Sequence, residues 1–463
     1  MKKEGFSSKL GFVLAAAGSA VGLGNIWRFP YLAAKYGGGI FLLTYFILML
    51  TFGYALLISE NCIGRMTGRS PIGAFRKLCR HQGITGKLIA PGGWINAIVP
   101  MLILPYYCVI GGWVTRYVFT FATSPVSDFS TGAASEAYFV NFLASPYGAI
   151  IFFALFVAIT AIVVCCGVEK GIERFSKILM PALILLILGI CIYSMFLPNA
   201  KAGLIYYLKP DWSKFSYMTV VEAMGQLFFS LSIAMGIMIT YGSYMRKDDD
   251  LVSSVNHVEL FDTAVSFLAG LMIIPAVVSF GGEEAAGNAG PGLIFVIMPQ
   301  VFASFPGGQI VGLLFFVLVL FAAATSAVSL LETNVHTLIQ QMRLKRKQAI
   351  TVCLIEVLII GVVTVLGYNL LKNVHPLAFI EQFKGKDILD TLDYISNSVL
   401  MPIGAIFTTL LVTVVVGLNK FSKEIKRSCK KWDREWIYHI CMIFIVIPCL
   451  LVVLLNATGL LNR

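Results

Sequence analysis

Charged residues are scarce in this sequence: Asp, Glu, Lys and Arg make up 13% of its 463 residues. Soluble globular domains contain about 25% charged residues, so the composition excludes a soluble protein. Hydrophobic residues account for 58% of the chain, and the mean hydropathy is +0.84. They form repeated runs of about 20 residues, the length that an α-helix needs to cross the hydrocarbon core of a bilayer. The sequence therefore predicts an all-α polytopic membrane protein.

Residues and motifs that carry catalysis are scarce as well. The five histidines lie near loops or the ends of apolar runs, without the spacing of metal ligands. There is no Walker-type glycine loop, no HExxH motif and no Ser-His-Asp order. The ten cysteines show neither CxxC spacing nor the pattern of a disulfide framework, and we interpret them as small apolar fillers. We therefore expect no enzyme activity.

Eleven apolar runs are predicted to span the membrane. The first is too long for a signal peptide and lacks a small-residue cleavage site, so we interpret it as a mature helix. The predicted spans are residues 8–35, 39–64, 92–120, 147–165, 176–197, 219–243, 255–281, 308–340, 348–368, 390–418 and 436–458.

Basic residues are distributed unevenly over the loops. Those on the side of the N-terminus hold 25 of the 35 Lys and Arg. Because positively charged loops stay in the cytoplasm, we expect a cytoplasmic N-terminus and an extracellular C-terminus in the cell membrane. The net charge of +11 is then a signal of topology. The lipid bilayer is the expected partner, without nucleic acid and without an obligate protein partner.

Two of the predicted spans are interrupted by small and polar residues. The first contains "GSAVGLGN" at 18–25, and the sixth contains "GQLFFSLSIAMG" at 225–236. The two lie an odd number of spans apart, which predicts inverted repeats at about 8–197 and 217–418 within a single domain, 1–463, that ends in an additional helix. Broken helices in matching positions indicate a binding site near the middle of the membrane. The spacing Gly18-x-x-x-Gly22 is also a motif of close helix packing, which is the alternative interpretation.

These segments carry a family resemblance. "SKLGFVLAAAGSAVGLGNIWRFPYLAAKYGGGIF" resembles the first helix of the neurotransmitter:sodium symporters, and the resemblance continues through "PYYCVIGGW", "GIERFSKILMP", "FDTAVSFLAG" and "FAAATSAVSLLE". It extends from residue 8 to about 418. Eleven spans resemble the shorter bacterial members, which carry aromatic or other hydrophobic amino acids. The resemblance implies a sodium-coupled symporter that works by alternating access.

The resemblance also implies two sodium ions. Both sites would be built from oxygen ligands, which hard cations prefer. The first would use the Ala20 carbonyl, Asn25, Ser230 and Asp262, together with the carboxylate of the substrate. The second would use the carbonyls of Gly18, Val21 and Ala322 and the hydroxyls of Thr325 and Ser326. For the two hydroxyls, a hydrogen bond to their own helix is the alternative.

Asp262 is a carboxylate within a predicted span, and such a group marks an ion or substrate path by default. Most family members have asparagine at this place, and chloride-dependent ones use a serine four residues further on, here Ser266. Because Asp262 can supply the negative charge itself, we expect transport that does not need chloride. The alternative is an acid at a helix end close to water.

Gly22 indicates the class of substrate. The amine carriers of the family have an aspartate there, so a glycine implies a substrate that brings its own carboxylate. The resemblance places this carboxylate at the Tyr107 hydroxyl and the amides near Leu23 and Gly24, and the ammonium at carbonyls near Phe229 and Ser232. The implied side-chain pocket suits aliphatic and aromatic L-amino acids, although core packing is the alternative for each member. Its residues are Ile103, Phe229, Met235, Ser326, Ser329 and Leu330.

The resemblance implies an outer gate, which is an ion pair between Arg28 and Asp393. Tyr106 and Phe229 would form an aromatic lid beneath this pair, and Gln226 would lie next to Arg28. Two further buried acids are expected to be structural, and Glu60 would brace the interrupted segments. The second acid is Glu332.

The inner gate departs from the leucine transporter of this family. Lys3 and Gln340 replace its arginine and aspartate, and Phe6 replaces a tryptophan, whereas Tyr244 matches. Two other functions stay open at this point, a membrane sensor that binds amino acids without transport and a sodium-coupled amine or osmolyte carrier. A channel would be a third, but a gate expected on each side of the site argues against it.

Overall fold

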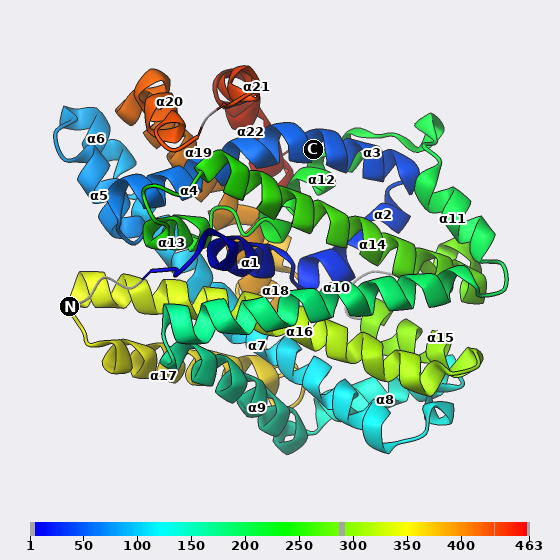
Figure 1. Cartoon of the computed structure of the whole chain (residues 1–463). Helices are drawn as coiled ribbons and strands as arrows, with labels where there is room; N and C mark the ends of the chain where they lie inside the picture. The colour runs from blue at the N-terminus through cyan, green and yellow to red at the C-terminus, as the bar shows by residue number, and fades with distance from the viewer. Residues whose placement is uncertain (1–4, 287–291, 430, 461–463) are drawn as a thin grey trace.

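The computed structural model describes residues 5–286, 292–429 and 431–460, with the side chains of 281–286 left aside. Helices form most of this part of the chain (Figure 1). Within it, extended pairing is limited to one isolated antiparallel bridge, Gly38 with Pro210. The prediction of an all-α protein is confirmed.

The first five predicted spans are all helical. The first is a bent pair of helices with an angle of 48° between its halves. Short helices follow the second span on one face of the protein. The bounds are α1 Lys9–Ala20, a turn Gly24–Arg28 leading into α2 Phe29–Lys35, α3 Gly39–Leu48, α4 Tyr54–Thr67, α5 Pro71–Cys79, α6 Gly83–Ile89, α7 Gly92–Thr123, α8 Gly132–Ala144, α9 Pro146–Cys165, a turn Val168–Glu173 and α10 Arg174–Met195.

The remaining spans follow the same pattern, with a second interruption at 231–236. The bounds are α11 Ala200–Leu208, α12 Tyr217–Ser230, α13 Ile237–Tyr244, α14 Leu251–Ala286, α15 Met298–Ser304, α16 Gly308–Met342, α17 Arg346–Leu366, α18 Ile388–Asp393, α19 Met401–Leu410, α20 Leu418–Lys426, α21 Glu435–Ile440 and α22 Val446–Ala457.

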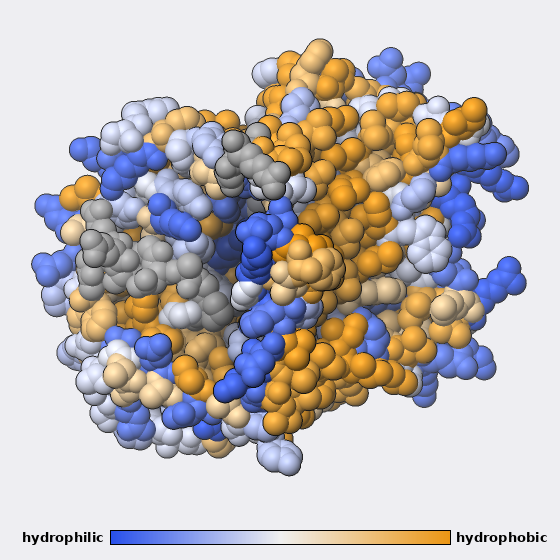
Figure 2. Space-filling model, turned by 180° about the vertical axis from the view of Figure 1, so that it is seen from behind, coloured by the Kyte–Doolittle hydropathy of each residue, from blue (hydrophilic) through white to orange (hydrophobic). Residues whose placement is uncertain are grey.

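The number of spans agrees with the prediction for the described residues. Nine helical segments are long and apolar enough to cross a membrane, and the bent pair 9–35 adds a tenth. The pair α12 and α13 supplies the eleventh, although its break is longer. Figure 2 shows a broad hydrophobic band between regions where hydrophilic residues gather, as expected for a protein that sits across a bilayer.

Two faces are used below. The N-terminal face carries residue 5, α5, α6 and the end of α13, and the opposite face carries α11 and α15 (Figure 1). The interrupted first span lies inside the bundle, where α1 packs against α10, α14 and α16 (Figure 1). Its run of alanines and glycines allows this close approach, since small side chains let helix backbones meet.

The second interruption carries unusual backbone conformations. Ser232 has a φ of 53° and Ala234 a φ of 60°, and Gly236 with a φ of 67° precedes α13. Non-glycine residues seldom adopt positive φ and do so mainly where the surroundings impose it, often at functional sites. The backbone is therefore held in a special shape at the depth where a binding site is predicted.

Candidate functional site

The two interruptions meet in the middle of the protein. α1 ends at Ala20, and the next turn is held by the Asn25 side chain, whose Oδ1 accepts a hydrogen bond from the Gly22 amide at 2.9 Å. The Ser232 hydroxyl donates to the carbonyl oxygen of Ser19 at 3.0 Å. The first and sixth spans are thus joined directly at their breaks.

Asp262 lies beside this junction and is fully buried. Its Oδ1 accepts from the Asn25 amide nitrogen and from the Ser230 hydroxyl, both at 2.7 Å. Its Oδ2 accepts from the Tyr45 hydroxyl at 3.2 Å. The side chains expected to form the first sodium site are therefore brought together.

This cluster suits a cation. In the described part of the chain, no basic side chain pairs with Asp262. A buried carboxylate without a positive partner is costly, so a small cation would be stabilised here. In this structure Asn25 presents its nitrogen to Asp262, and the amide must turn to offer oxygen to an ion.

Two further residues belong to this cluster. Tyr45 was not predicted from the sequence, where it is one hydroxyl within the apolar run "IFLLTYFILML". Ser266 was considered only for chloride, and here it accepts from the Asn25 amide nitrogen at 2.8 Å. A polar residue inside an apolar run was the available signal for both.

At the expected second sodium site the first span meets α16. A Cβ atom on Gly18 would lie 3.4 Å from the Cβ of Thr325. The Thr325 hydroxyl donates to the carbonyls of Phe321 at 3.1 Å and Ala322 at 3.0 Å in its own helix. The Ser326 hydroxyl donates to Ser19 O at 3.1 Å. The expected residues are adjacent here. The Thr325 hydroxyl makes the alternative bonds within its own helix, whereas the Ser326 hydroxyl bonds the first span.

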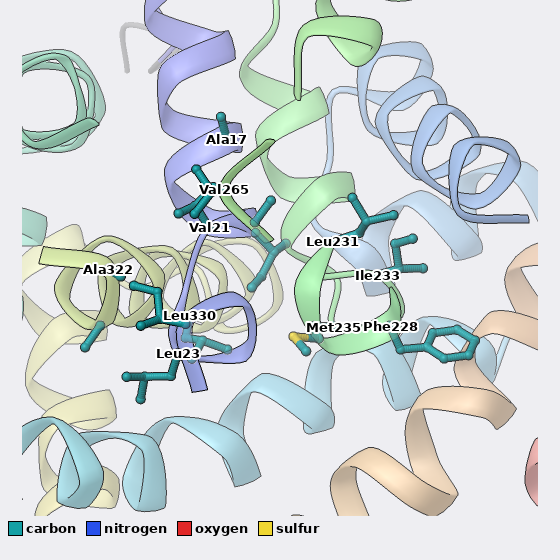
Figure 3. Close-up of a cluster of buried hydrophobic side chains, with 14 of the residues drawn as sticks. Ala17, Val21, Leu23, Phe228, Leu231, Ile233, Met235, Val265, Ala322 and Leu330 are labelled. Carbon is teal, nitrogen blue, oxygen red and sulfur yellow. The ribbon is translucent and has the colours of Figure 1, made fainter. Parts of the chain in front are cut away.

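A cavity of about 20 Å³ lies where the amino-acid pocket is predicted. Figure 3 shows Leu330 of α16 beside the first span, with Met235 on the interrupted part of the sixth. Most of the predicted pocket and backbone residues line it. They are Ala20, Gly22, Gly24, Ile103, Tyr107, Phe229, Ser232, Met235, Ser326 and Leu330.

Three predicted residues do not line this cavity. Ser329 is turned away, since it donates to Thr325 O at 3.0 Å and accepts from the Tyr241 hydroxyl at 2.7 Å. Ser230 belongs to the Asp262 cluster. Leu23 lines a larger cavity described below, and its amide donates to the Tyr107 hydroxyl at 3.4 Å.

A second cavity, of about 250 Å³, lies between the small amino-acid pocket and the face opposite the N-terminal face. Arg28, Tyr106, Phe229 and Asp393 all line it, as expected for an outer gate. Gly24, Tyr107 and Phe229 line both cavities, so these three residues lie between them.

The gate residues are not paired as expected. Among the described residues, Arg28 Nη2 pairs with Glu222 Oε2, at 4.0 Å. Asp393 Oδ1 accepts from the Tyr106 hydroxyl at 3.1 Å and from the Asn397 amide at 2.5 Å. Arg28 and Asp393 thus share a cavity without closing it, and sequence reasoning missed Glu222.

Gln226 also differs from the expectation. Its amide nitrogen donates to Gly24 O at 2.8 Å, so in this structure it steadies the interrupted first span and not Arg28. Glu60 braces the sixth span through a hydrogen bond of 2.8 Å from the Ala234 amide to Oε1.

The N-terminal face is closed. The Phe6 ring is 4% exposed and packs edge-on against Tyr241 and Tyr244, at 5.6 and 6.2 Å between centroids. Glu332 pairs with Arg346 at 2.6 Å and accepts from the Tyr244 hydroxyl at 2.7 Å.

Of the two residues expected at the inner gate, Lys3 lies outside the described residues. Gln340 Oε1 accepts from the Ser70 amide at 2.8 Å, which links α16 to the start of α5.

Interrupted membrane helices that meet around a buried carboxylate, with a cavity open toward one face and the other face closed, define a secondary transporter. Comparison with known proteins identifies which kind. The profile of the sodium:neurotransmitter symporter family matches residues 3–134 and 146–461. The chain therefore belongs to this family.

Individual relatives agree. The sodium-dependent transporter YhdH of Bacillus subtilis is 35% identical over 462 residues, which cover 99% of this chain and 98% of that protein. A sodium-dependent transporter of Haemophilus influenzae is 34% identical over 434 residues, 92% of each chain. The solved structure of MhsT in complex with L-phenylalanine has a TM-score of 0.87 and 36% identity, and the match covers 98% of this chain and 99% of that one.

These findings confirm the family, the multi-pass helical fold and the expectation of sodium-dependent transport. The relatives are transporters, so the expectation that the chain is not an enzyme is confirmed as well.

Proposed function

We propose that this protein is a sodium-coupled symporter that imports hydrophobic L-amino acids, both aliphatic and aromatic, without a need for chloride. The observation that carries the proposal is the Asp262 cluster beside a small, mainly apolar pocket. MhsT, which this chain resembles over nearly its whole length, was solved with L-phenylalanine.

The charges in the site support sodium coupling. Asp262 supplies one fixed negative charge, and an amino acid adds a carboxylate and an ammonium group. A sodium ion between the two carboxylates offsets their repulsion, so ion and substrate raise each other's affinity. Asn25 and Ser230 complete the oxygen ligands once the Asn25 amide turns. A second ion is proposed between Gly18 and Thr325.

The negative charge of Asp262 also supports independence from chloride. In chloride-dependent members of the family, a serine helps to bind a chloride ion, and the ion supplies a negative charge. Asp262 supplies a negative charge itself, so chloride is not needed. Ser266 already bonds Asn25 in the Asp262 cluster, so it shares its surroundings with this charge.

The apolar lining favours a hydrophobic side chain. Ile103, Met235 and Leu330 contribute no charge, and Met235 is flexible enough to fit different shapes. Because the cavity measures about 20 Å³, an amino acid enters only if Phe229 moves away from it. We therefore place the structure before substrate binding, with Phe229 as the inner part of the lid.

We infer alternating access from the difference between the two faces, because one has a cavity and the other is closed. We propose that Arg28 leaves Glu222 and pairs with Asp393 when the outer cavity closes over bound substrate, as the halves 8–197 and 217–418 rock around the site. The positively charged loops support a cytoplasmic N-terminal face in the cell membrane.

Uptake into proteoliposomes tests the proposal. Labelled phenylalanine and leucine are offered with inward Na⁺ or K⁺ gradients, each with chloride or gluconate. We expect accumulation with Na⁺ only, unchanged by gluconate. Sodium-dependent binding without accumulation would favour a sensor, and accumulation of amines that lack a carboxylate would favour an amine carrier.

A further inference from the structure

The start of α1 is held by a buried carboxylate from another part of the chain. Glu173 ends the turn that precedes α10, and it is 1% exposed. Its Oε2 accepts from the Ser7 amide at 2.7 Å, and its Oε1 accepts from the Ser7 hydroxyl at 2.6 Å and the Ser8 hydroxyl at 3.0 Å. The Lys177 ammonium donates to Oε1 at 2.6 Å.

These contacts tie the helix start to α10. Ser8 is the N-cap of α1, because its hydroxyl oxygen accepts from the Gly11 amide at 3.0 Å while its proton goes to Glu173. A negative charge at a helix N-terminus is also favoured by the helix dipole. Three of the four donors come from the segment of α1, and only Lys177 belongs to α10. Movement of α1 away from α10 therefore breaks most of the bonds to Glu173.

Gly11 makes this arrangement sterically possible. A Cβ atom at this position would lie 2.1 Å from Oε1 and 2.2 Å from Cδ of Glu173. Real Cβ atoms do not approach other atoms so closely, so any larger residue forces the carboxyl group away from α1. The backbone of α1 and the carboxyl group are fitted to each other.

We propose that Glu173 is a positioning residue: it holds the N-terminal end of α1 against α10 in the state closed to the N-terminal face, and it releases α1 when the site opens there. The inference rests on the proposed function, because alternating access requires such an opening. Next to Ser7, Phe6 is 4% exposed and packs against Tyr241 and Tyr244, which closes this face around the start of α1. On release Glu173 keeps Lys177 and gains water, so its charge stays compensated.

The same helix reaches the ion sites at its other end. α1 is 12 residues long, and Gly18 to Ala20 at its C-terminal end lie at the proposed sodium sites. A helix fixed at its start presents its end in one position, so Glu173 and sodium stabilise the same closed state. Loosening the start is therefore expected to lower the apparent affinity for sodium.

The test uses the full-length protein in nanodiscs and two variants that act differently. E173Q removes the charge, and G11A displaces the carboxyl group without changing any charge. E169Q alters an exposed acid of the same turn, and G189A adds a methyl group on α10 where no atom lies within 4 Å; both serve as controls. Hydrogen exchange of the peptide covering 5–20 and the sodium dependence of phenylalanine binding are measured.

We expect faster exchange of this peptide in E173Q and G11A, and a sodium concentration for half-maximal binding raised at least fivefold. The controls should match wild type. Exchange and sodium dependence unchanged in both variants would overturn the proposal, and so would a loss of protection across the whole chain, which indicates a structural role. If wild-type protein shows no sodium-driven uptake in the proteoliposome assay described above, the proposed function fails. If its uptake is sodium-driven and the variants behave like the controls, the assignment of Glu173 fails alone.

Discussion

The amide nitrogen of Asn25 lies 2.7 Å from Oδ1 of Asp262, and this buried hydrogen bond joins the interrupted first span to α14. The other end of the same amide accepts from the Gly22 backbone. One side chain thus connects the fixed negative charge of the site to the backbone that would contact the substrate. Any ion that binds Asp262 displaces or turns Asn25, and this movement reaches Gly22 directly.

Replacing Asp262 with asparagine should abolish this coupling. D262N removes the fixed charge of the cluster and places a second amide next to that of Asn25. We expect sodium-driven uptake in gluconate to fall at least tenfold, with partial recovery in chloride, measured in proteoliposomes. D433N, a change at an exposed acid paired with Lys431, is the control. Full chloride-free uptake by D262N would remove the role assigned to Asp262.

A methyl group at Gly24 should disturb the lid. A Cβ atom there would lie 2.5 Å from Cδ1 of Phe229, so the ring cannot keep its place. We expect G24A to weaken phenylalanine binding about tenfold, which corresponds to about 1.4 kcal/mol. G225A is the matched control, because its Cβ would meet only Arg28 Nη2 at 3.7 Å. Equal affinities of the two variants in equilibrium binding would contradict the role of Phe229.

Whether Arg28 pairs with Glu222 or with Asp393 should determine how readily the outer gate closes. E222Q removes the present partner and leaves Asp390 and Asp393 as the acids that line the same cavity as Arg28. Partly exposed ion pairs contribute about 0.2–1 kcal/mol, so we expect substrate to dissociate up to about fivefold more slowly from E222Q. Substrate should dissociate faster from D393N than from the wild-type protein. Stopped-flow release of a labelled substrate measures both, and identical rates would show that the pair does not switch.

Much of the site could be predicted because its residues break a strong pattern. Gly22 and Asn25 interrupt an apolar run, and Asp262 is an acid inside another, so each is visible without neighbours. The number of spans follows equally from the length of the apolar runs. These features depend on the bilayer as a solvent, which acts on every residue alike.

The remaining features depend on how helices face each other. Ser329 was expected in the pocket, but the rotation of α16 turns it toward Tyr241. Arg28 was expected to pair with Asp393, while α12 brings Glu222 closer. Tyr45 reaches Asp262 from another helix, and its place inside an apolar run did not indicate which residue it contacts. Such contacts join residues far apart in sequence, and no spacing rule reports them.

The additional helix is anchored by an ion pair between Arg434, whose side chain is 24% exposed, and the buried Glu259. Arg434 donates to both oxygens of Glu259, with Nη1 at 3.0 Å from Oε1, and its guanidinium lies 3.8 Å from the centre of the Tyr54 ring. Removing one member of such a pair leaves an uncompensated buried charge, at a cost of about 3–5 kcal/mol. We expect R434M to lower the thermal unfolding temperature clearly and R434M/E259Q to recover part of the loss. A double variant less stable than R434M would contradict this account.

The size of the pocket should decide between aromatic and aliphatic substrates. Met235 lines the small cavity opposite Leu330, and its unbranched side chain adapts to ligands of different shape. M235F places a rigid ring in the same space, so the room left for a bulky substrate decreases while leucine still fits.

Loss of well-fitted contacts or a steric overlap in a pocket changes relative affinity by about 1–3 kcal/mol. We therefore expect the ratio of phenylalanine to leucine uptake to fall about tenfold in M235F. M238F, at a buried residue of α13 that does not line the cavity, is a control for the effect of a larger side chain on folding. An unchanged ratio in M235F would mean that the substrate side chain binds elsewhere, and the pocket lined by Ile103 and Leu330 would lose its assignment.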